Sequence, residues 1–389
     1  MLIFAACLAI FVYGMVASML GTITPGLAAK FQLTNVQVGY IALAQGVGLV
    51  IASVSVGPLL DRRGKKVGLL LGLGLVTFSL LALANATGFQ VVAGAMAVLG
   101  MGGGIIITGA NALGSDVSES KRASVLNFLN VFVGLGGFAT PFIAGNLLAG
   151  DAVRVAYTAA ALTGATFLVH AFLRIAPPAA PRPGHKAGAV FSVPLLYVFA
   201  AATFLYTACE FGVWNWLAKY LIVRGLPAAT ALNVLSLGFA LGLLLGRVIV
   251  APILFRIPPL TVTIVSSTLM ALTTFAVLHV STPALAGPLV FLAGIAMAPV
   301  FPTTVAMVAD AFKERSGTAI GFTITCGFSG LVVSSPLIGW LAGPDPAGLG
   351  TGLVVLPVFS AALVVVYLVL RLKRGAALET PSPSASPGA

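Results

Sequence analysis

The chain has 389 residues, of which 59% are hydrophobic and only 7% are charged, and its mean hydropathy is +1.11. A soluble domain carries about 25% charged residues, so this chain lacks the polar side chains that a water-facing surface needs, and a soluble protein is excluded. The net charge of +11 would suit a nucleic-acid-binding protein, but the basic residues stand between apolar segments, where membrane proteins carry orientation signals, and we expect no nucleic-acid partner.

Apolar segments follow one another along almost the whole chain, beginning at Met1, and we expect the first one to be retained as a helix. Residues 67–86 and 90–115 contain no ionisable side chain, and about 20 such residues cross the hydrocarbon core as a helix. Continuous rather than alternating apolar runs favour helices over a barrel. Polar or Pro/Gly-rich breaks lie near Lys30, 61–66, 87–89, 116–122, 150–154, 176–190, 224–228, 255–259, 280–283, 311–316, 343–347 and from Arg371 on. The sequence therefore predicts an all-α membrane protein with 12 transmembrane helices.

Basic residues are distributed unequally between alternate loops. One set holds Arg62, Arg63, Lys65, Lys66, Lys121, Arg122, Arg174, Arg182, Lys186, Arg256, Lys313, Arg315, Arg371, Lys373 and Arg374. The other set holds little beyond Lys30, Arg154 and Arg224. Because an excess of Lys and Arg marks the cytoplasmic side, we predict a multi-pass protein of the cell membrane, the inner membrane of a bacterium, with both termini in the cytoplasm.

The two halves of the chain resemble each other at an offset of 194 residues. At this offset GPLLDR at 57–62 falls on APILFR at 251–256, and Asp116 falls on Asp310. Two parallel repeats related by an axis along the membrane normal are a known transporter plan, with the substrate held between them. We predict two six-helix bundles related by a pseudo-two-fold axis. The expected parts are an N-terminal bundle (1–175), a cytoplasmic linker (176–190), a C-terminal bundle (191–374) and a disordered cytoplasmic tail (375–389).

The most highly charged stretch is GPLLDRRGKK, residues 57–66. Topology alone would explain its basic residues but not its acid and its glycines. The pattern Gly57-x3-Asp61-Arg62-x-Gly64-Lys65-Lys66 matches every specified position of the loop 2–3 signature of the major facilitator superfamily. With the twelve spans and the repeat, the chain resembles that family over nearly its whole length. The resemblance implies a monomeric transporter working by alternating access, without enzymatic activity, cofactor or metal.

The resemblance also implies a latch that closes the cytoplasmic side. In it, Asp61 contacts the start of the helix that begins near Ser316, and Arg62 or Lys65 pairs with Asp116. In the second half, Arg256 pairs with Asp310, although Phe255 stands where the equivalent acid would be. The predicted gating residues are Gly57, Asp61, Arg62, Gly64, Lys65, Asp116, Arg256 and Asp310.

An intramembrane acid is costly and by default marks function. Glu210 lies midway along a predicted helix, on a polar and aromatic face with Tyr206 and Trp214. It is either a substrate acceptor and protonation site or a structural carboxyl bonded to a neighbouring helix. We interpret Arg247 as extending to the membrane surface. The predicted substrate-binding residues are Tyr13, Gln45, Asn111, Asn130, Tyr206, Glu210, Trp214, Asn215 and Thr325, any of which could instead be an interhelical hydrogen bond.

Two stretches point to a substrate class. LGMGGGIIITGANAL at 99–113 and FLYTACEFGVWNWL at 204–217 resemble the fucose-permease-like branch of sugar–proton symporters. In that branch acids on helices 1 and 4 can handle protons, but the corresponding positions here are Gly21 and Ile107, which leaves Glu210 for coupling. Amides, a carboxylate and tryptophan faces suit a polyhydroxylated solute, so we predict a sugar or related polyol.

Two alternatives remain open. The stretch GLGGFATPFIAG at 134–145 partly matches the glycine-rich helix 5 of drug or metabolite efflux antiporters, with Thr140 and Ala144 where glycines would stand. A membrane receptor that transports nothing would share the hydropathy, but it would need neither the repeat nor Asp61. An enzyme is not expected, because the sequence shows no metal-ligand spacing, nucleotide loop or nucleophile arrangement.

Overall fold

A computed structural model describes residues 2–117, 122–174, 190–280, 283–312 and 316–379. Within these ranges every regular element is a helix, and twelve helical segments are long and apolar enough to cross a membrane. The predicted fold class is thereby confirmed. Most of the predicted linker (176–190) and the last ten residues lie outside the described residues.

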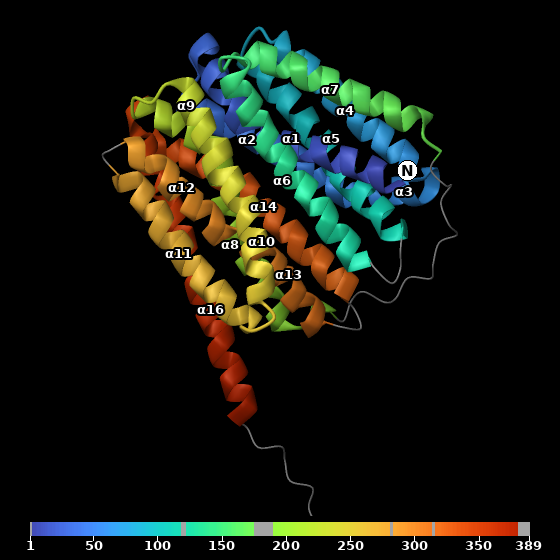
Figure 1. Ribbon diagram of the computed structural model, residues 1–389, viewed down its shortest axis with the longest axis vertical. Coiled ribbons are helices and arrows are strands. Elements are labelled where there is room, and N and C mark those ends of the chain that lie inside the picture. Colours follow the sequence, from blue (N-terminus) through green and yellow to red (C-terminus); the bar gives the residue numbers. More distant parts are fainter. Residues whose placement is uncertain (1, 118–121, 175–189, 281–282, 313–315, 380–389) are drawn as a thin grey trace, which may run out of the picture.

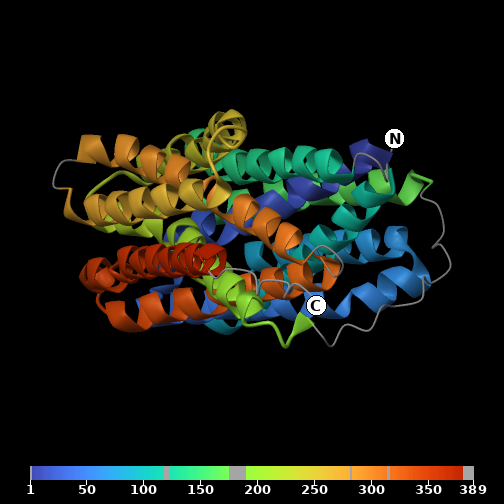
Figure 2. The ribbon, with the colours of Figure 1, turned by 90° about the horizontal axis from the view of Figure 1, so that it is seen from below.

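Six spans come from each half of the chain (Figure 1). The first half consists of α1 (Leu2–Phe31), α2 (Asn35–Ser55), α3 (Gly57–Arg63), α4 (Lys65–Ala84), α5 (Phe89–Val117), α6 (Arg122–Asn146) and α7 (Ala152–Phe172). The second consists of α8 (Pro194–Val223), α9 (Ala228–Asn233), the π-helix η2 (Val234–Ala240), α10 (Leu241–Ile253), α11 (Pro259–His279), α12 (Pro283–Met297), α13 (Val300–Ala311), α14 (Ser316–Ala342), η4 (Pro346–Gly348), α15 (Leu349–Leu353) and α16 (Val355–Glu379). In Figure 2 the spans run side by side along one direction.

Two predicted boundaries are corrected. The stretch expected to be a loop at 57–66 is mostly helical, because α3 occupies Gly57–Arg63. Gly64 then reverses the chain between α3 and α4 with a φ of 89°, a conformation that only glycine adopts without strain, which explains the second glycine of the signature. Residues 375–379, expected to belong to a tail, are helical, since α16 continues to Glu379 and projects beyond the other helices in Figure 1.

Glycines set the closest helix contacts within each half. At several of them an added Cβ would overlap a carbonyl oxygen of the neighbouring helix, and such small residues let helix backbones approach closely in lipid. The contacts occur in equivalent pairs: Gly48 with Ala97 and Gly242 with Phe291, Gly100 with Gln45 and Gly294 with Phe239, Gly136 with Phe11 and Gly330 with Phe204. Each contact in the second half lies 193 or 194 positions after its counterpart. The repeat predicted from sequence is therefore present in the packing.

The halves meet mainly through α1 with α8, α2 with α14, and α6 with α9 and η2. We call the end of the molecule that carries Arg62–Lys66 and the end of α16 the basic end. The end where α1 leads into α2, near Gln32–Thr34, is the opposite end. Contacts between the halves concentrate toward the opposite end. A Cβ atom added to Gly39 of α2 would lie 3.0 Å from Pro336 Cα of α14, and one added to Gly339 of α14 would overlap the Asn35 carbonyl oxygen. The halves are thus held together at the end that is poor in basic residues.

Candidate functional site

Trp214 of α8 lies where the two halves touch. An added Cβ on Gly137 of α6 would lie 3.3 Å from its indole ring, and one on Gly21 of α1 would overlap its carbonyl oxygen. On its own half the ring packs edge-on against Phe239, with centroids 5.0 Å apart. The residues one turn before Trp214 on α8 consequently face the middle of the interface between the halves.

Glu210 lies in that position and is half-buried. The Tyr206 hydroxyl and the Trp214 indole lie beside its carboxylate, but the Tyr206 hydroxyl is buried and completes no hydrogen bond. Tyr13 of α1 brings a second phenol from the other half into electrostatic range of Glu210. A half-buried carboxylate between the two halves has the position expected of a substrate acceptor or proton carrier in transporters built from repeats.

Arg247 of α10 reaches across to the other half. It is half-buried, and its Nη1 donates to the carbonyl oxygen of the exposed residue Asn130 on α6, 3.4 Å away. Its Nε is buried without a hydrogen-bond partner, and its charge attracts the Glu210 carboxylate. The two groups form no ion pair among those the structure records. The general rule that intramembrane ions mark function would have selected Arg247 from sequence.

The other predicted binding residues fall into two groups. Gln45 and Asn215 are buried and bonded between helices: Gln45 Nε2 donates to the Val16 carbonyl at 3.0 Å, and Asn215 Nδ2 donates to Ser335 Oγ at 2.9 Å. Tyr206 is only 1% exposed and packs near Phe301. These three therefore present almost no surface to a ligand in this conformation, and their part in binding stays a prediction.

The remaining predicted residues keep some accessible surface. Asn111 and Thr325 are half-buried, and Asn130 is exposed. Thr325 Oγ1 donates to Gly321 and Asn130 Nδ2 donates to Leu126, each one turn back on its own helix, which leaves their other hydrogen-bonding capacity available. Of the predicted binding residues, these three and Glu210 keep the most accessible surface in this conformation.

Two of the predicted latch contacts are not formed in this conformation. Asp61 and Arg62 are exposed on α3, and Asp61 forms no hydrogen bond or ion pair within the described part of the chain. Arg256 and Asp310 are both exposed and do not pair with each other, so the pairing expected from sequence is absent here. The side chain of Asp116 lies outside the described residues. Asp61 and the Arg256–Asp310 pair therefore form no latch contact here, whereas Lys65 does have a partner, and its pairing with Asp116 stays a prediction.

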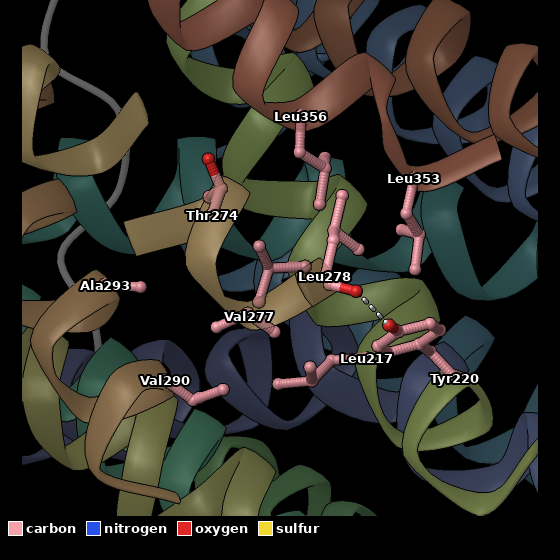
Figure 3. A pocket seen from close by; sticks show the side chains of 10 residues that line it. Leu217, Tyr220, Thr274, Val277, Leu278, Val290, Ala293, Leu353 and Leu356 are labelled. Carbon is pink, nitrogen blue, oxygen red and sulfur yellow. Dashed lines mark hydrogen bonds between the residues drawn. The ribbon is translucent and has the colours of Figure 1, made fainter. Parts of the chain in front are cut away.

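A small cavity lies inside the second half and is unrelated to Glu210. It measures about 20 Å³ and is lined almost entirely by apolar side chains, including Leu217, Val277 and Leu356 (Figure 3). The one hydrogen bond drawn there joins the Tyr220 hydroxyl to the Leu278 carbonyl at 3.2 Å. A space of this size holds about one water molecule, and the two hydroxyls of its lining, Tyr220 and Thr274, already donate to backbone carbonyls. We interpret it as a packing gap rather than a ligand site.

Comparisons with known proteins agree on the fold. The profile of the Major Facilitator Superfamily matches residues 6–335. Among solved structures, the nucleoside transporter NupG matches with a TM-score of 0.76 at 15% identity, over 95% of this chain and 98% of that one. The xylose transporter XylE from E. coli, in a partially occluded inward-open conformation, matches with a TM-score of 0.75 at 11% identity, covering 94% and 95%.

A bacterial homolog of the human lysosomal transporter Spinster, inward-facing and unoccupied, matches with a TM-score of 0.74 at 14% identity, over 98% of each chain. No curated protein sequence matches the chain. At these identities the solved structures establish the fold alone.

Proposed function

Because this chain belongs to the major facilitator superfamily, we propose that it is a secondary transporter that moves a sugar or a related polyhydroxylated solute by alternating access. The proposal includes the orientation predicted above, with the basic end in the cytoplasm, and the division into two bundles joined by the 176–190 linker. It rests on one observation above all: Glu210 is a half-buried carboxylate between the two halves, facing Tyr13 of one half and Arg247 of the other.

The chemistry of these groups favours a polyol over a lipophilic cation. Glu210 accepts hydrogen bonds, Arg247 donates them, and Asn111 does both, a combination that matches adjacent hydroxyl groups. An arginine beside the acid would repel a cationic drug. Solved structures with this fold include proteins named as a nucleoside transporter and a D-xylose–proton symporter, and both kinds of solute carry several hydroxyls. We further propose that Glu210 carries the proton if transport is coupled, since Gly21 and Ile107 replace the acids of the fucose-permease-like branch.

The substrate class is tested by thermal unfolding of the purified protein with a panel of hexoses, pentoses, polyols and nucleosides. A solute that binds only the folded state raises the unfolding temperature, by more as its concentration exceeds its Kd. We expect at least one polyhydroxylated solute to do so, and lipophilic cations to have no effect. Stabilisation by lipophilic cations alone would support an efflux antiporter and overturn this proposal.

Glu210→Gln is expected to weaken binding of the stabilising solute by about tenfold or more, because a hydrogen bond to a charged group contributes about 1.5–3 kcal/mol. Uptake into proteoliposomes separates the two roles of the carboxylate. If Glu210 only carries the proton, solute exchange without a pH gradient persists while gradient-driven accumulation is lost. Asp151→Asn is the matched control, since that acid caps α7 at the opposite end and pairs only with Arg154. Wild-type binding and accumulation in Glu210→Gln would contradict both roles.

A further inference from the structure

A buried amide joins the two halves at the opposite end. Asn35, the first residue of α2, is fully buried. Its Oδ1 accepts a hydrogen bond from Lys219 Nζ of α8 at 2.7 Å, and its Nδ2 donates to the Asp345 carbonyl, just after α14, at 2.8 Å. One side chain of the first half is thereby bonded to two separate segments of the second.

Lys219 depends on this contact for as long as it stays buried. It is only 7% exposed although it carries an ammonium group, and no carboxylate lies within ion-pair distance of it among the described residues. Besides the hydrogen bond to Asn35, Nζ makes a cation–π contact with Trp216, whose ring centroid lies 5.7 Å away. A buried charge without a partner is strongly unfavourable. The Asn35 amide is therefore what allows Lys219 to remain buried while the halves are together.

A second polar contact joins α6 of the first half to α9 of the second half. The side chains of Asn146 and Asn233 exchange hydrogen bonds, with N–O distances of 2.6 and 3.1 Å. The helices that carry these contacts also pack closely. Gly39 of α2 lies against Pro336 of α14, and Gly145 of α6 lies against Ala229 of α9, with little room for a larger side chain at either glycine. Two hydrogen-bonded points and close packing thus join the halves at this end, whereas Asp61 is exposed and makes no recorded contact at the basic end.

We propose that Asn35, Lys219 and the Asp345 carbonyl, together with the Asn146–Asn233 pair, form a gate lock that holds the opposite end closed and must open once in every transport cycle. In the orientation proposed above this is the extracellular end. The lock uses a buried lysine held by an amide instead of an ion pair, so opening exposes the ammonium to water. Hydration of the Lys219 ammonium then offsets part of the free-energy cost of breaking the two hydrogen bonds of Asn35, so the lock can open and close reversibly.

The lock is tested by spin-label distances, which need no knowledge of the substrate. In a background without Cys7, Cys209 and Cys326, one label pair is placed at exposed positions of the opposite end, Leu147 and Thr230. Another pair, Arg63 and Phe255, reports on the basic end. We expect Asn35→Ala to raise the ratio of open to closed populations at the opposite end by about tenfold or more, since it leaves the ammonium buried and unpaired. Distances at the basic end should shorten in the same molecules.

Two further variants make the result specific. Adding Lys219→Met to Asn35→Ala should restore closure at least in part, because no buried charge is then left without a partner. Arg224→Met is the control, since Arg224 is a cation of the same end whose recorded hydrogen bonds, to Tyr220 and Val280, stay within one half. Unchanged distances in Asn35→Ala, or a double variant as open as the single one, would overturn the lock.

Folding is monitored separately. Asn35→Ala keeps the capping box of α2, which Thr34 and Gln37 form, so the helix start should survive. In the cysteine-free background, Asn146→Cys and Asn233→Cys, joined by a short bifunctional thiol reagent with a reducible link, replace that pair of hydrogen bonds with a covalent bridge and leave Asn35 in place. Cross-linked protein should lose transport and regain it when the link is reduced. Cross-linked protein that still transports would show that this end need not open.

Discussion

Gly21→Ala is expected to reduce transport by about tenfold to a hundredfold while leaving both halves folded, since overpacking a close contact costs about 1–3 kcal/mol. The added Cβ would overlap the carbonyl oxygen of Trp214 on α8, and helix backbone cannot move aside as a side chain can. Gly21 belongs to the first half and Trp214 to the second. The two halves can relieve the overlap by separating, so closure toward the opposite end becomes unfavourable and the cycle stops with that end open.

The control is a glycine with the same kind of contact inside one half. At Gly100 an added Cβ would overlap the Gln45 carbonyl oxygen, between α5 and α2. No rigid-body movement of the halves relieves that overlap, so Gly100→Ala should instead lower the unfolding temperature of the protein. Transport assays, thermal unfolding and the Leu147–Thr230 label distance distinguish the two variants. Normal transport by Gly21→Ala, with an unchanged distance, would contradict the close approach of α1 and α8.

The overlap at Gly21 also bears on coupling. The resemblance to sugar–proton symporters places an acid at this position, and the structure has no space for a side chain there. Glycine at 21 is thus a consequence of how closely α1 and α8 approach. A coupling acid has to lie elsewhere along the interface, and Glu210, about one helical turn from Trp214 on α8, is a half-buried acid in that position.

Some features were predictable because they depend on local sequence. Hydropathy identified the twelve spans, since each must shield its backbone from lipid by itself. The repeat was predictable because glycines at helix contacts, such as Gly48 and Gly242, tolerate no substitution that fills the contact. The start of α14 at Ser316 was likewise predicted, from the charged residues that precede it.

The site was harder to predict because it depends on how two halves face each other. Helical spacing places Tyr206, Glu210 and Trp214 on one side of α8, but it does not reveal that Tyr206 is buried near Phe301 while Glu210 is only half-buried. The sequence placed Arg247 near a helix end but did not indicate its hydrogen bond to the Asn130 carbonyl of the other half. Lys219 was missed for a similar reason: its partner Asn35 is 184 residues away.

Asp61→Asn is expected to reduce transport by about tenfold or more with little change in substrate affinity. In the conformation described here Asp61 is exposed on α3 and makes no recorded contact, so the substitution should leave the stability of this conformation unchanged. The loss would arise when the basic end closes and the carboxylate meets the N-terminal end of α14, an interaction worth up to about 2 kcal/mol when partly buried. Asparagine keeps the size of the side chain and removes the charge.

The measurement compares uptake into proteoliposomes with solute binding to the purified variant. Arg63→Gln is the matched control: Arg63 is an exposed neighbour on α3 at a variable position of the signature, and its loss should change neither. The gate lock stabilises the conformation with the opposite end closed, and the latch stabilises the conformation with the basic end closed. Adding Asn35→Ala to Asp61→Asn should therefore recover part of the lost transport, because weakening both contacts restores the ratio of the two conformations. Wild-type uptake by Asp61→Asn would remove the latch, and the signature at 57–66 would then serve topology alone.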